Sequence, residues 1–597
     1  MNRAAGPRPS LAAGNAVTGW IVLAGCWGLL AAAWLTWAAA RLAALISGGH
    51  VPPFGRDWIT ALAHGRTSQT WPGTPSPLVA AVGAAFLASA AVLAVLAWQR
   101  ISRLFPAPGD PVAALRHNHR IRHLAPARAA RTAVRLRPIT LAGRNPRGLA
   151  PADTGLVLGD LKRPRGDGPP LYATWEDTIV AFMAPRSGKT TALAVPYVLS
   201  APGPVVATSV RADLWAATAR PRAACGVIWL FDPQRVTHQD QAWWWNPLAG
   251  LATVEAAHRL ASHFVLTVDD ATRRDIWGPA AQELLSSLLL AAAASDRTLR
   301  EVARWLDDPA APAPSRLLDD AGFGALASSL RGAQHGAPET RDGIYQTART
   351  AARCLHDEEI MAWVTPPGAR LPAFDPAAFA RGRDTLYLLT ESRAAASPLV
   401  AALTDIAMRA ARRHAEREAG RLDPPMVLVL DEAANICRIA DLPDLYSHLG
   451  GRGIIPVTIL QSYEQGVTVW GEPGMAALWG AATKKVIGAG VDSPRLTRDL
   501  ATLIGQHDVP VRSVSYGDGR VSEQISVQRR QIMQPADIRA LPPGTALLLA
   551  TGARPALIQL RPWYAGPSAG AVSDAIRRAE DAMRAGARQA SSERSRA

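Results

Sequence analysis

The sequence predicts an α/β protein in which a mostly parallel sheet is interrupted by a block of helices and preceded by two membrane-spanning helices. Short apolar runs alternate with helical stretches through residues 171–250 and 381–565, as buried strands and helices do in a doubly wound sheet. Residues 251–380 have a helical pattern almost throughout. Two long uncharged apolar runs lie within the first 100 residues, and each is long enough for a membrane span.

Residues 1–100 are expected to form a membrane anchor, with helices at about 16–40 and 77–98. The stretch from Leu11 to Ala40 has no charged residue, and neither has the stretch from Thr67 to Gln99. A hydrocarbon core of about 30 Å requires roughly 20 apolar residues in a helix. A cleaved signal peptide is the alternative for the first run, which is longer than the usual apolar core of such a peptide.

The arginine distribution predicts the orientation of this anchor. Two arginines precede the first helix and nine lie between residues 100 and 137, whereas the connecting loop carries three. Positive residues favour the cytoplasmic side of a membrane. We therefore expect a multi-pass protein of the cell inner or plasma membrane, with both termini cytoplasmic and residues of about 42–76 outside.

The charge is concentrated near the membrane segments and does not cover the whole protein. Of the formal net charge of +15, residues 1–150 account for +14, because they hold sixteen arginines, no lysine and two acidic residues. The rest of the chain is nearly neutral, so a DNA contact there needs a local patch. Residues 101–170 are interpreted as a basic juxtamembrane linker with a short β-rich lead-in. The basic stretch after Gln99 is expected to lie against anionic membrane lipids, with a plain topology signal as the alternative.

The expected strands continue along the chain after this linker. Their ranges are 178–182, 204–210, 227–231, 384–389, 426–430, 455–460, 485–487 and 546–549. The helical block at 251–380 interrupts the series and is expected to form an inserted all-α domain. The residues from 566 to 597 are rich in Arg and Ala and are expected to be a polar tail, weakly helical or disordered.

The first candidate site is a loop of small residues between the strand at 178–182 and a helix. Its members are Pro185, Arg186, Ser187, Gly188, Lys189, Thr190 and Thr191. Backbone N–H groups in such a loop, together with a helix N-terminus, bind a phosphate chain. Lys189 can reach the β- and γ-phosphates, and the Thr190 hydroxyl can bind Mg²⁺. Met183 and Arg186 stand where P-loops often have glycines, so a chance strand–loop–helix turn is the alternative.

Two further candidate groups follow later strands. Asp431 and Glu432 follow the strand at 426–430, which is the Walker B arrangement. Asp431 would hold Mg²⁺ through water, and Glu432 would act as the general base for the attacking water. Gln461 follows the strand at 455–460 and would sense the γ-phosphate. The alternatives are an acidic cap on the next helix and a polar surface turn.

Arg452 lies in a glycine-rich loop before the strand at 455–460 and is a candidate arginine finger. Such a residue would act across a subunit boundary on the charge that develops at the γ-phosphoryl group. A solvated loop arginine is the alternative, and Arg341, Arg349 and Arg353 are rivals for the role. The sequence thus predicts ATP and Mg²⁺ as cofactors. The expected catalytic residues are Lys189, Glu432, Gln461 and Arg452. The expected metal ligands are Thr190 and Asp431.

Taken together, these motifs resemble the TraG/TraD-type coupling proteins of type IV secretion and conjugation. The resemblance covers roughly residues 16–565. It is carried by the segments 205–214, 231–233, 246–248, 430–435, 451–462 and 542–564. The chain departs from the family pattern at Met183 and Arg186 in the P-loop and at Ser209 and Arg211 after the second strand. These departures leave Lys189 and the two acidic residues in place.

The resemblance implies a RecA-like P-loop ATPase domain at 171–250 and 381–565 that assembles as a homohexamer with ATP sites between subunits. It implies a cargo, either single-stranded DNA with its relaxase or an effector protein, that ATP hydrolysis drives into a secretion channel. A membrane-tethered translocase of double-stranded DNA for plasmid or chromosome segregation is one alternative, but the segment after residue 565 is too short for its DNA-reading module. A cargo receptor that does not hydrolyse ATP is the other.

Overall fold

The computed structural model describes residues 14–102, 115, 119–163, 166–268, 276–368, 370–391, 396–517 and 520–594. The chain divides into two compact units, residues 1–107 and 108–597. Arg3 and Arg8, which were expected to orient the first span, lie outside the described residues, as does most of the basic stretch between 103 and 118.

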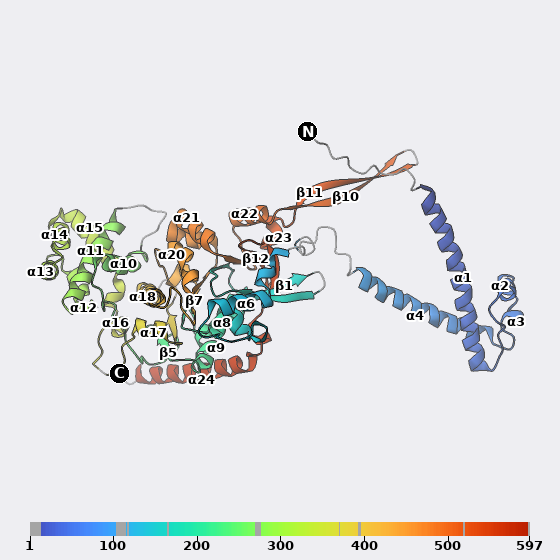
Figure 1. Ribbon diagram of the computed structural model, residues 1–597, viewed down its shortest axis with the longest axis horizontal. Helices are drawn as coiled ribbons and strands as arrows, with labels where there is room; N and C mark the ends of the chain where they lie inside the picture. Colours follow the sequence, from blue (N-terminus) through green and yellow to red (C-terminus); the bar gives the residue numbers. More distant parts are fainter. Residues whose placement is uncertain are drawn as a thin grey trace. The chain divides into compact units, whose positions relative to one another are not determined.

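The first unit contains two long apolar helices, α1 (Gly14–Ser47) and α4 (Ser76–Ser102) (Figure 1). Within them, Trp27–Ser47 and Ser76–Leu93 are long and apolar enough to cross a membrane. Both helices extend beyond the expected limits. The expectation of two apolar N-terminal helices is therefore confirmed.

The connection between these helices is folded. It contains the short helices α2 (Arg56–Ala63) and α3 (Thr67–Thr70). The buried Trp58 indole N–H donates to the Thr70 carbonyl at 2.9 Å. Together with Trp71, Trp58 packs in a small apolar cluster against Ala40, Ala43 and Val79 of the two long helices.

The second unit is built on a sheet of 11 strands in the order β2-β1-β13-β12-β9-β3-β8-β7-β4-β6-β5. The strands from β9 to β5 are parallel, and the strands from β12 to β2 extend the sheet in antiparallel fashion. The bounds of the sheet strands are β1 (Leu156–Arg163), β2 (Gly166–Ala173), β3 (Ile179–Phe182), β4 (Val205–Ser209), β5 (Ile228–Phe231), β6 (Thr385–Leu389), β7 (Met426–Asp431), β8 (Ile454–Leu460), β9 (Lys484–Ile487), β12 (Thr545–Ala550) and β13 (Ala556–Gln559). All eight expected strands are among them, so the predicted α/β class is confirmed.

Both faces of the parallel strands are buried because alternate side chains point to opposite faces. In β3, Val180 and Phe182 belong to one apolar core, and Ile179 and Ala181 belong to the other. Helices on the first face include α18 (Ser397–Arg417), α20 (Leu442–Leu449), α21 (Tyr463–Ala481) and α22 (Pro494–Ile504). Helices on the second face include α6 (Pro126–Leu136), α8 (Val195–Ser200), α9 (Asp213–Arg222) and α24 (Ala569–Arg594).

The block between β5 and β6 is helical, as its pattern indicates, and it shares the first apolar core. Its helices are α10 (Val254–Val265), α11 (Trp277–Ala294), α12 (Leu299–Asp307), α13 (Ala313–Asp320), α14 (Gly324–His335), α15 (Pro338–Ala351), α16 (Glu358–Val364) and α17 (Pro376–Arg381). Trp243 and Trp245, at the entrance to the block, are buried, and Trp243 packs against Trp363 and Phe374. These two tryptophans therefore fill the core.

Three segments differ from expectation. β1 and β2 lie largely within 101–170, where a linker with a short β-rich lead-in was expected, but they belong to the main sheet, where Asp160 of β1 pairs with Gln559 of β13. The expected tail forms α24, which packs along α9 and buries Val572 and Ala575 (Figure 1). A separate hairpin of β10 (Gln506–Gly517) and β11 (Arg520–Gln531) was not expected. In each case the pairing partner is distant in sequence, or the apolar positions are too few to give a strong pattern.

Candidate active site

The loop of small residues lies at the carboxyl end of β3, where the backbone turns sharply. Gly188 has a φ of 91° and Arg186 a φ of 64°, both in the left-handed region. The Ser187 hydroxyl donates to the Ala184 carbonyl at 2.6 Å, which closes the turn. Pro185 and Arg186 are exposed on the loop, whereas Ser187 is buried beneath it.

The helix after the loop starts as one wide π turn, Thr190–Ala194, and continues as α8. Pro196 lies in the first turn of α8 and has no N–H to bond to the carbonyl four residues earlier. A π turn is the usual way in which a helix accommodates such an irregularity near a functional site. The first turn thereby presents Thr190 and Thr191 next to Gly188.

Met183 does not fill the loop, although it stands where a glycine was expected. Its side chain is fully buried in the core. A Cβ added at Gly488, just after β9, would lie 2.7 Å from the Met183 Cγ. The glycine at 488 therefore makes room for the methionine, and the loop itself remains open.

Side chains from the carboxyl ends of three neighbouring parallel strands meet beside the loop. The Lys189 Nζ lies 2.6 Å from Glu432 Oε1 and 3.4 Å from Asp431 Oδ1. Gln461 Nε2 donates to the same Glu432 oxygen at 3.0 Å. The Thr190 hydroxyl donates to Asp431 Oδ2 at 3.5 Å. This edge of an open α/β sheet is where such folds bind ligands.

Two polar residues beside Glu432 and Gln461, respectively, were not predicted as site residues. Asn435 Nδ2 donates to Glu432 Oε2 at 3.2 Å, and Gln465 Oε1 accepts from the Gln461 backbone N–H at 3.1 Å. Glu432 itself has a φ of 55°, which is uncommon for a residue other than glycine and is often found at functional sites. Asn435 lies three residues after Glu432, and this spacing was the one sequence signal that could have identified it.

The two carboxyl groups differ in their electrostatics. Burial raises the pKa of Asp431 to about 6, against the opposing effect of Lys189. Burial also acts to raise the pKa of Glu432, but the hydrogen bond and charge of Lys189 outweigh it and hold that pKa below its ordinary value. At neutral pH, Glu432 is therefore ionised and accepts hydrogen bonds. The ionised form of Asp431 is less well stabilised by its surroundings.

The residues present fit a magnesium ion. The Asp431 Oδ1 atom is buried, and its partner in the described part of the chain is Lys189, at an ion-pair distance of 3.4 Å that is longer than a good hydrogen bond. The Thr190 hydroxyl, hydrogen-bonded to the other oxygen of the same carboxylate, supplies a second hard oxygen ligand. Lys189 also pairs more closely with Glu432, so a magnesium ion would add to the weak stabilisation of the buried Asp431 carboxylate.

Arg452 does not join this cluster within the chain. It lies in the 3-10 turn Gly450–Arg452, immediately before β8, whereas Gln461 follows the other end of that strand. Its guanidinium group pairs with Glu416 of α18. Arg452 therefore lies at the opposite end of β8 from Gln461 and away from the Lys189 cluster of its own chain.

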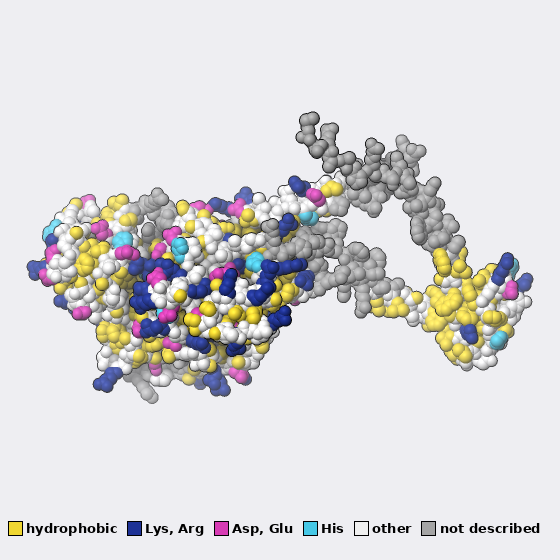
Figure 2. All heavy atoms as spheres, in the orientation of Figure 1, with side chains coloured by type: hydrophobic (Ala, Val, Ile, Leu, Met, Phe, Trp, Pro, Cys, Tyr) yellow, Lys and Arg dark blue, Asp and Glu magenta, His cyan; other side chains and the backbone are white. Residues whose placement is uncertain are grey.

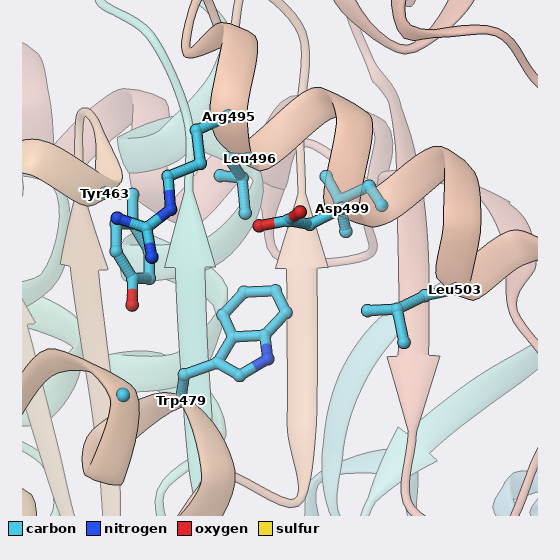
Figure 3. Close-up of a pocket in the computed structure, with 8 residues that line it drawn as sticks. Tyr463, Trp479, Arg495, Leu496, Asp499 and Leu503 are labelled. Atoms are coloured by element: carbon cyan, nitrogen blue, oxygen red, sulfur yellow. The ribbon is translucent and has the colours of Figure 1, made fainter. Parts of the chain in front are cut away.

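A small pocket of about 140 Å³ lies between α21 and α22 (Figure 3). Tyr463 and Trp479 form one side, and Arg495, Asp499 and Leu503 form the other. The centroid of the Phe182 ring, at the end of β3, lies 6.1 Å from the centroid of the Tyr463 ring and 5.7 Å from that of the Trp479 ring. The pocket is close in sequence to Gln461 but contains no residue of the phosphate loop.

Residues 425–543 match a family model described as the TraM recognition site of TraD and TraG. Several solved structures are similar to the chain, among them these three. The bacterial conjugative coupling protein TrwBdeltaN70 has 18% identity and a TM-score of 0.48, with 66% of this chain and 87% of that chain covered. The plasmid coupling protein TrwB in complex with ADP and Mg²⁺ has 18% identity, a TM-score of 0.47 and coverages of 66% and 88%. VirB4 of Thermoanaerobacter pseudethanolicus has 14% identity, a TM-score of 0.39 and coverages of 69% and 97%. The comparison with curated proteins gave no match.

Proposed function

Because the chain belongs to the TraG/TraD coupling protein family, we propose that it is a membrane-anchored ATPase that couples a cargo to a conjugation or type IV secretion channel. The observation that carries this proposal is the convergence of Lys189, Glu432 and Gln461 beside the buried Asp431. These groups come from a P-loop and from the ends of two other strands. Their contacts fit ATP hydrolysis better than a structural ion pair, because one lysine is shared by two carboxylates beside a phosphate-type loop and a polar amide.

Each residue then has a distinct chemical role. The loop from Pro185 to Thr191 surrounds the phosphates with its backbone N–H groups, and Lys189 moves from Glu432 to the β- and γ-phosphates. Bound Mg²⁺, held by Thr190 and Asp431, would neutralise phosphate charge. Glu432, once released by Lys189, accepts a proton from the attacking water. Gln461 reports the presence of the γ-phosphate through its hydrogen bond to Glu432.

The proposed cargo is single-stranded DNA with its relaxase, or an effector protein, and the proposed assembly is a homohexamer in the inner or plasma membrane. Supporting this location, the chain has two apolar helices of membrane-spanning length. The position of Arg452, away from the site of its own chain, fits a finger that acts on a neighbouring subunit. Channel components are the expected partners, in keeping with the family.

The test is ATP turnover by the full chain in detergent, measured alone, with single-stranded DNA and with double-stranded DNA. We expect turnover that single-stranded DNA stimulates and that Lys189→Ala abolishes. Lys162→Ala is the matched control, because Lys162 donates to Thr545 at the antiparallel edge of the sheet, outside the cluster. Absence of turnover, or turnover that Lys189→Ala leaves intact, would reject the motor. Preferential stimulation by double-stranded DNA would favour the segregation translocase.

A further inference from the structure

A cleft of about 580 Å³ lies between helix α6, the loop at 145–151 and strand β2. Much of its wall is apolar, from proline, alanine and leucine side chains. Its two charged residues are Arg131 and Arg147, and no acidic residue lines it. Within the described ranges, neither arginine forms an ion pair with a carboxylate. The cleft is therefore an apolar cavity with two uncompensated positive charges.

Tyr172, in β2, also lines this cleft. The residue is 4% exposed, and among the described residues no hydrogen bond of its hydroxyl is found. Burial raises the pKa of Tyr172, so the hydroxyl keeps its proton and can donate. A bound acceptor oxygen would complete this hydrogen bond.

The first turn of α6 also faces the cleft. Helix α6 has 11 residues and starts at Pro126 after Ala125, which provides no side-chain cap. Pro126 has no N–H, and the N–H groups of Arg128 and Ala129 donate to the Ala125 carbonyl, so this turn offers an anion the Ala127 N–H and the helix dipole. Both add to the attraction that the two arginines exert on an anionic group.

The outer face of α6 indicates which anion is available. Arg128, Arg131 and Arg135 follow one another at helical spacing, on the face opposite the buried residues Ala129, Ala130, Ala133 and Leu136. Figure 2 shows Lys and Arg side chains gathered over the part of the molecule where Figure 1 draws α6. Juxtamembrane basic helices of this kind are attracted to anionic lipids, at about 1 kcal/mol per residue.

The position of α6 in the chain links it to a membrane. Helix α4, which holds the second apolar span, ends at Ser102, and α6 begins at Pro126. The anionic surface nearest along the chain is therefore the lipid headgroup layer. A phospholipid also combines a phosphate with apolar carbon, as the cleft combines arginines with apolar walls.

We propose that this cleft is a binding site for the headgroup of an anionic phospholipid. Arg131 and Arg147 bind the phosphate oxygens in charge-assisted hydrogen bonds. Tyr172 donates to a further headgroup oxygen, and the apolar walls pack against the glycerol carbons. The site is separate from the phosphate loop and does not depend on ATP hydrolysis.

The test is a titration of the full chain, in uncharged detergent, with fluorescently labelled phosphatidylglycerol and, separately, labelled phosphatidylcholine. We expect Arg131→Gln with Arg147→Gln to weaken phosphatidylglycerol binding at least tenfold. Arg128→Gln with Arg135→Gln is the matched control, because it removes the same charge from the same surface but outside the cleft. The control variant should change the affinity less than threefold, and neither variant should alter phosphatidylcholine binding.

Tyr172→Phe keeps the fold and the charge and should weaken phosphatidylglycerol binding about threefold to tenfold. An equal loss in the two double variants would overturn the site and indicate a diffuse basic surface. Competition by inorganic phosphate as strong as that by the lipid would indicate a site for free phosphate. Displacement by a hexaglutamate peptide at lower concentration than by lipid would indicate a peptide groove, and either result rejects the proposal. None of these measurements requires ATP turnover, so they stand apart from the test of the motor.

Discussion

At the residue scale, one lysine lies between two carboxyl groups whose pKa values are shifted in opposite directions. Lys189 holds Glu432 in the charged form, whereas burial raises the pKa of Asp431 to about 6. In the mechanism that we propose, ATP binding separates Lys189 from Glu432, and this exchange frees the base only when phosphates occupy the loop. Such an arrangement would keep the base engaged with Lys189 whenever no nucleotide is bound.

Glu432→Gln should lower ATP turnover by about a hundredfold or more and leave nucleotide binding largely intact. A glutamine keeps the shape and the hydrogen bonds of the side chain but cannot accept the proton, and general-base catalysis is worth about 10²–10⁴-fold. Turnover and equilibrium binding of a fluorescent ATP analogue are the measurements. The control is Glu339→Gln, an exposed acid in α15. Unchanged turnover in Glu432→Gln would remove this residue from the mechanism.

Binding of Mg²⁺ with nucleotide should weaken as the pH falls through about 6. The metal requires the ionised form of Asp431, and protons compete for it once the pH is below its pKa of about 6. The apparent Kd should rise about tenfold per pH unit below that point. Titrations between pH 5 and 8 are the measurement. A flat profile would exclude Asp431 as a ligand.

The same pKa has a consequence for stability. Because the folded pKa of Asp431 is about 6 and its ordinary value 3.8, the folded protein binds this proton more tightly than the unfolded chain. The stabilising contribution is complete below pH 3.8 and is lost as the pH rises through 6, by an amount on the order of 3 kcal/mol. Asp431→Asn should remove this part of the pH dependence from denaturant unfolding curves. Identical pH profiles for the two proteins would show that Asp431 binds its proton equally in the folded and unfolded states.

At the scale of elements, β3 and β9 accommodate the methionine of the phosphate loop between them. Gly488→Ala should destabilise the fold by about 1–3 kcal/mol, because the new methyl group meets Met183. Met183→Ala should cost about 2–5 kcal/mol by leaving a cavity. The double variant should be more stable than the sum of the two costs predicts, by about 1 kcal/mol or more, because the added methyl group occupies the vacated space.

Chemical unfolding of the four proteins in this cycle measures the coupling. Gly480→Ala is the control, since a Cβ at that helical position would meet nothing within 4 Å and alanine is the better helix former. Strict additivity of Gly488→Ala and Met183→Ala would show that the two residues do not share space.

The sequence predicts an element well when neighbouring residues determine it, and poorly when contacts with distant residues do. The strands around Lys189, Asp431 and Gln461 could be placed because each is a continuous apolar run that ends in polar residues. Their side chains meet because carboxyl ends of parallel strands share one edge, which topology alone implies. For Asn435 the sequence offers only its three-residue spacing from Glu432, because the left-handed backbone of Glu432 that accompanies their contact has no sequence signal at a residue other than glycine.

At the scale of the whole molecule, the sequence was least informative where partners are far apart. The strands β1 and β2 have the pattern of a linker because half of the pairing of β1 comes from β13, near the other end of the chain. Helix α24 has few apolar side chains, and its two buried residues, Val572 and Ala575, find their contacts on the body. The pattern of neighbouring residues predicts neither the pairing of β1 with β13 nor the packing of α24 on the body.

The predicted orientation can be tested with one native and one introduced cysteine. Cys225 is exposed in the second unit, and Ser68 is exposed in the connection between the apolar helices. In sealed cells, a membrane-impermeant maleimide should label Ser68→Cys but should label Cys225 only after lysis. Mass-shift electrophoresis gives the readout. Labelling of Cys225 before lysis would place the body outside and reverse the orientation.

The pairing of Asp160 with Gln559 also implies a delay during synthesis between the appearance of β1 and that of its partner strand β13. About 400 residues separate the two partners, and a ribosome adding roughly 5–20 residues per second needs roughly 20–80 s to make them. During that interval β1 has one unpaired edge, of the kind that other strands can join. A chain that ended before residue 556 would lack β13 and keep that edge unpaired, although its apolar helices had already been made. The edge of β1 is therefore covered only late in synthesis, shortly before α24 is made and packs on the body.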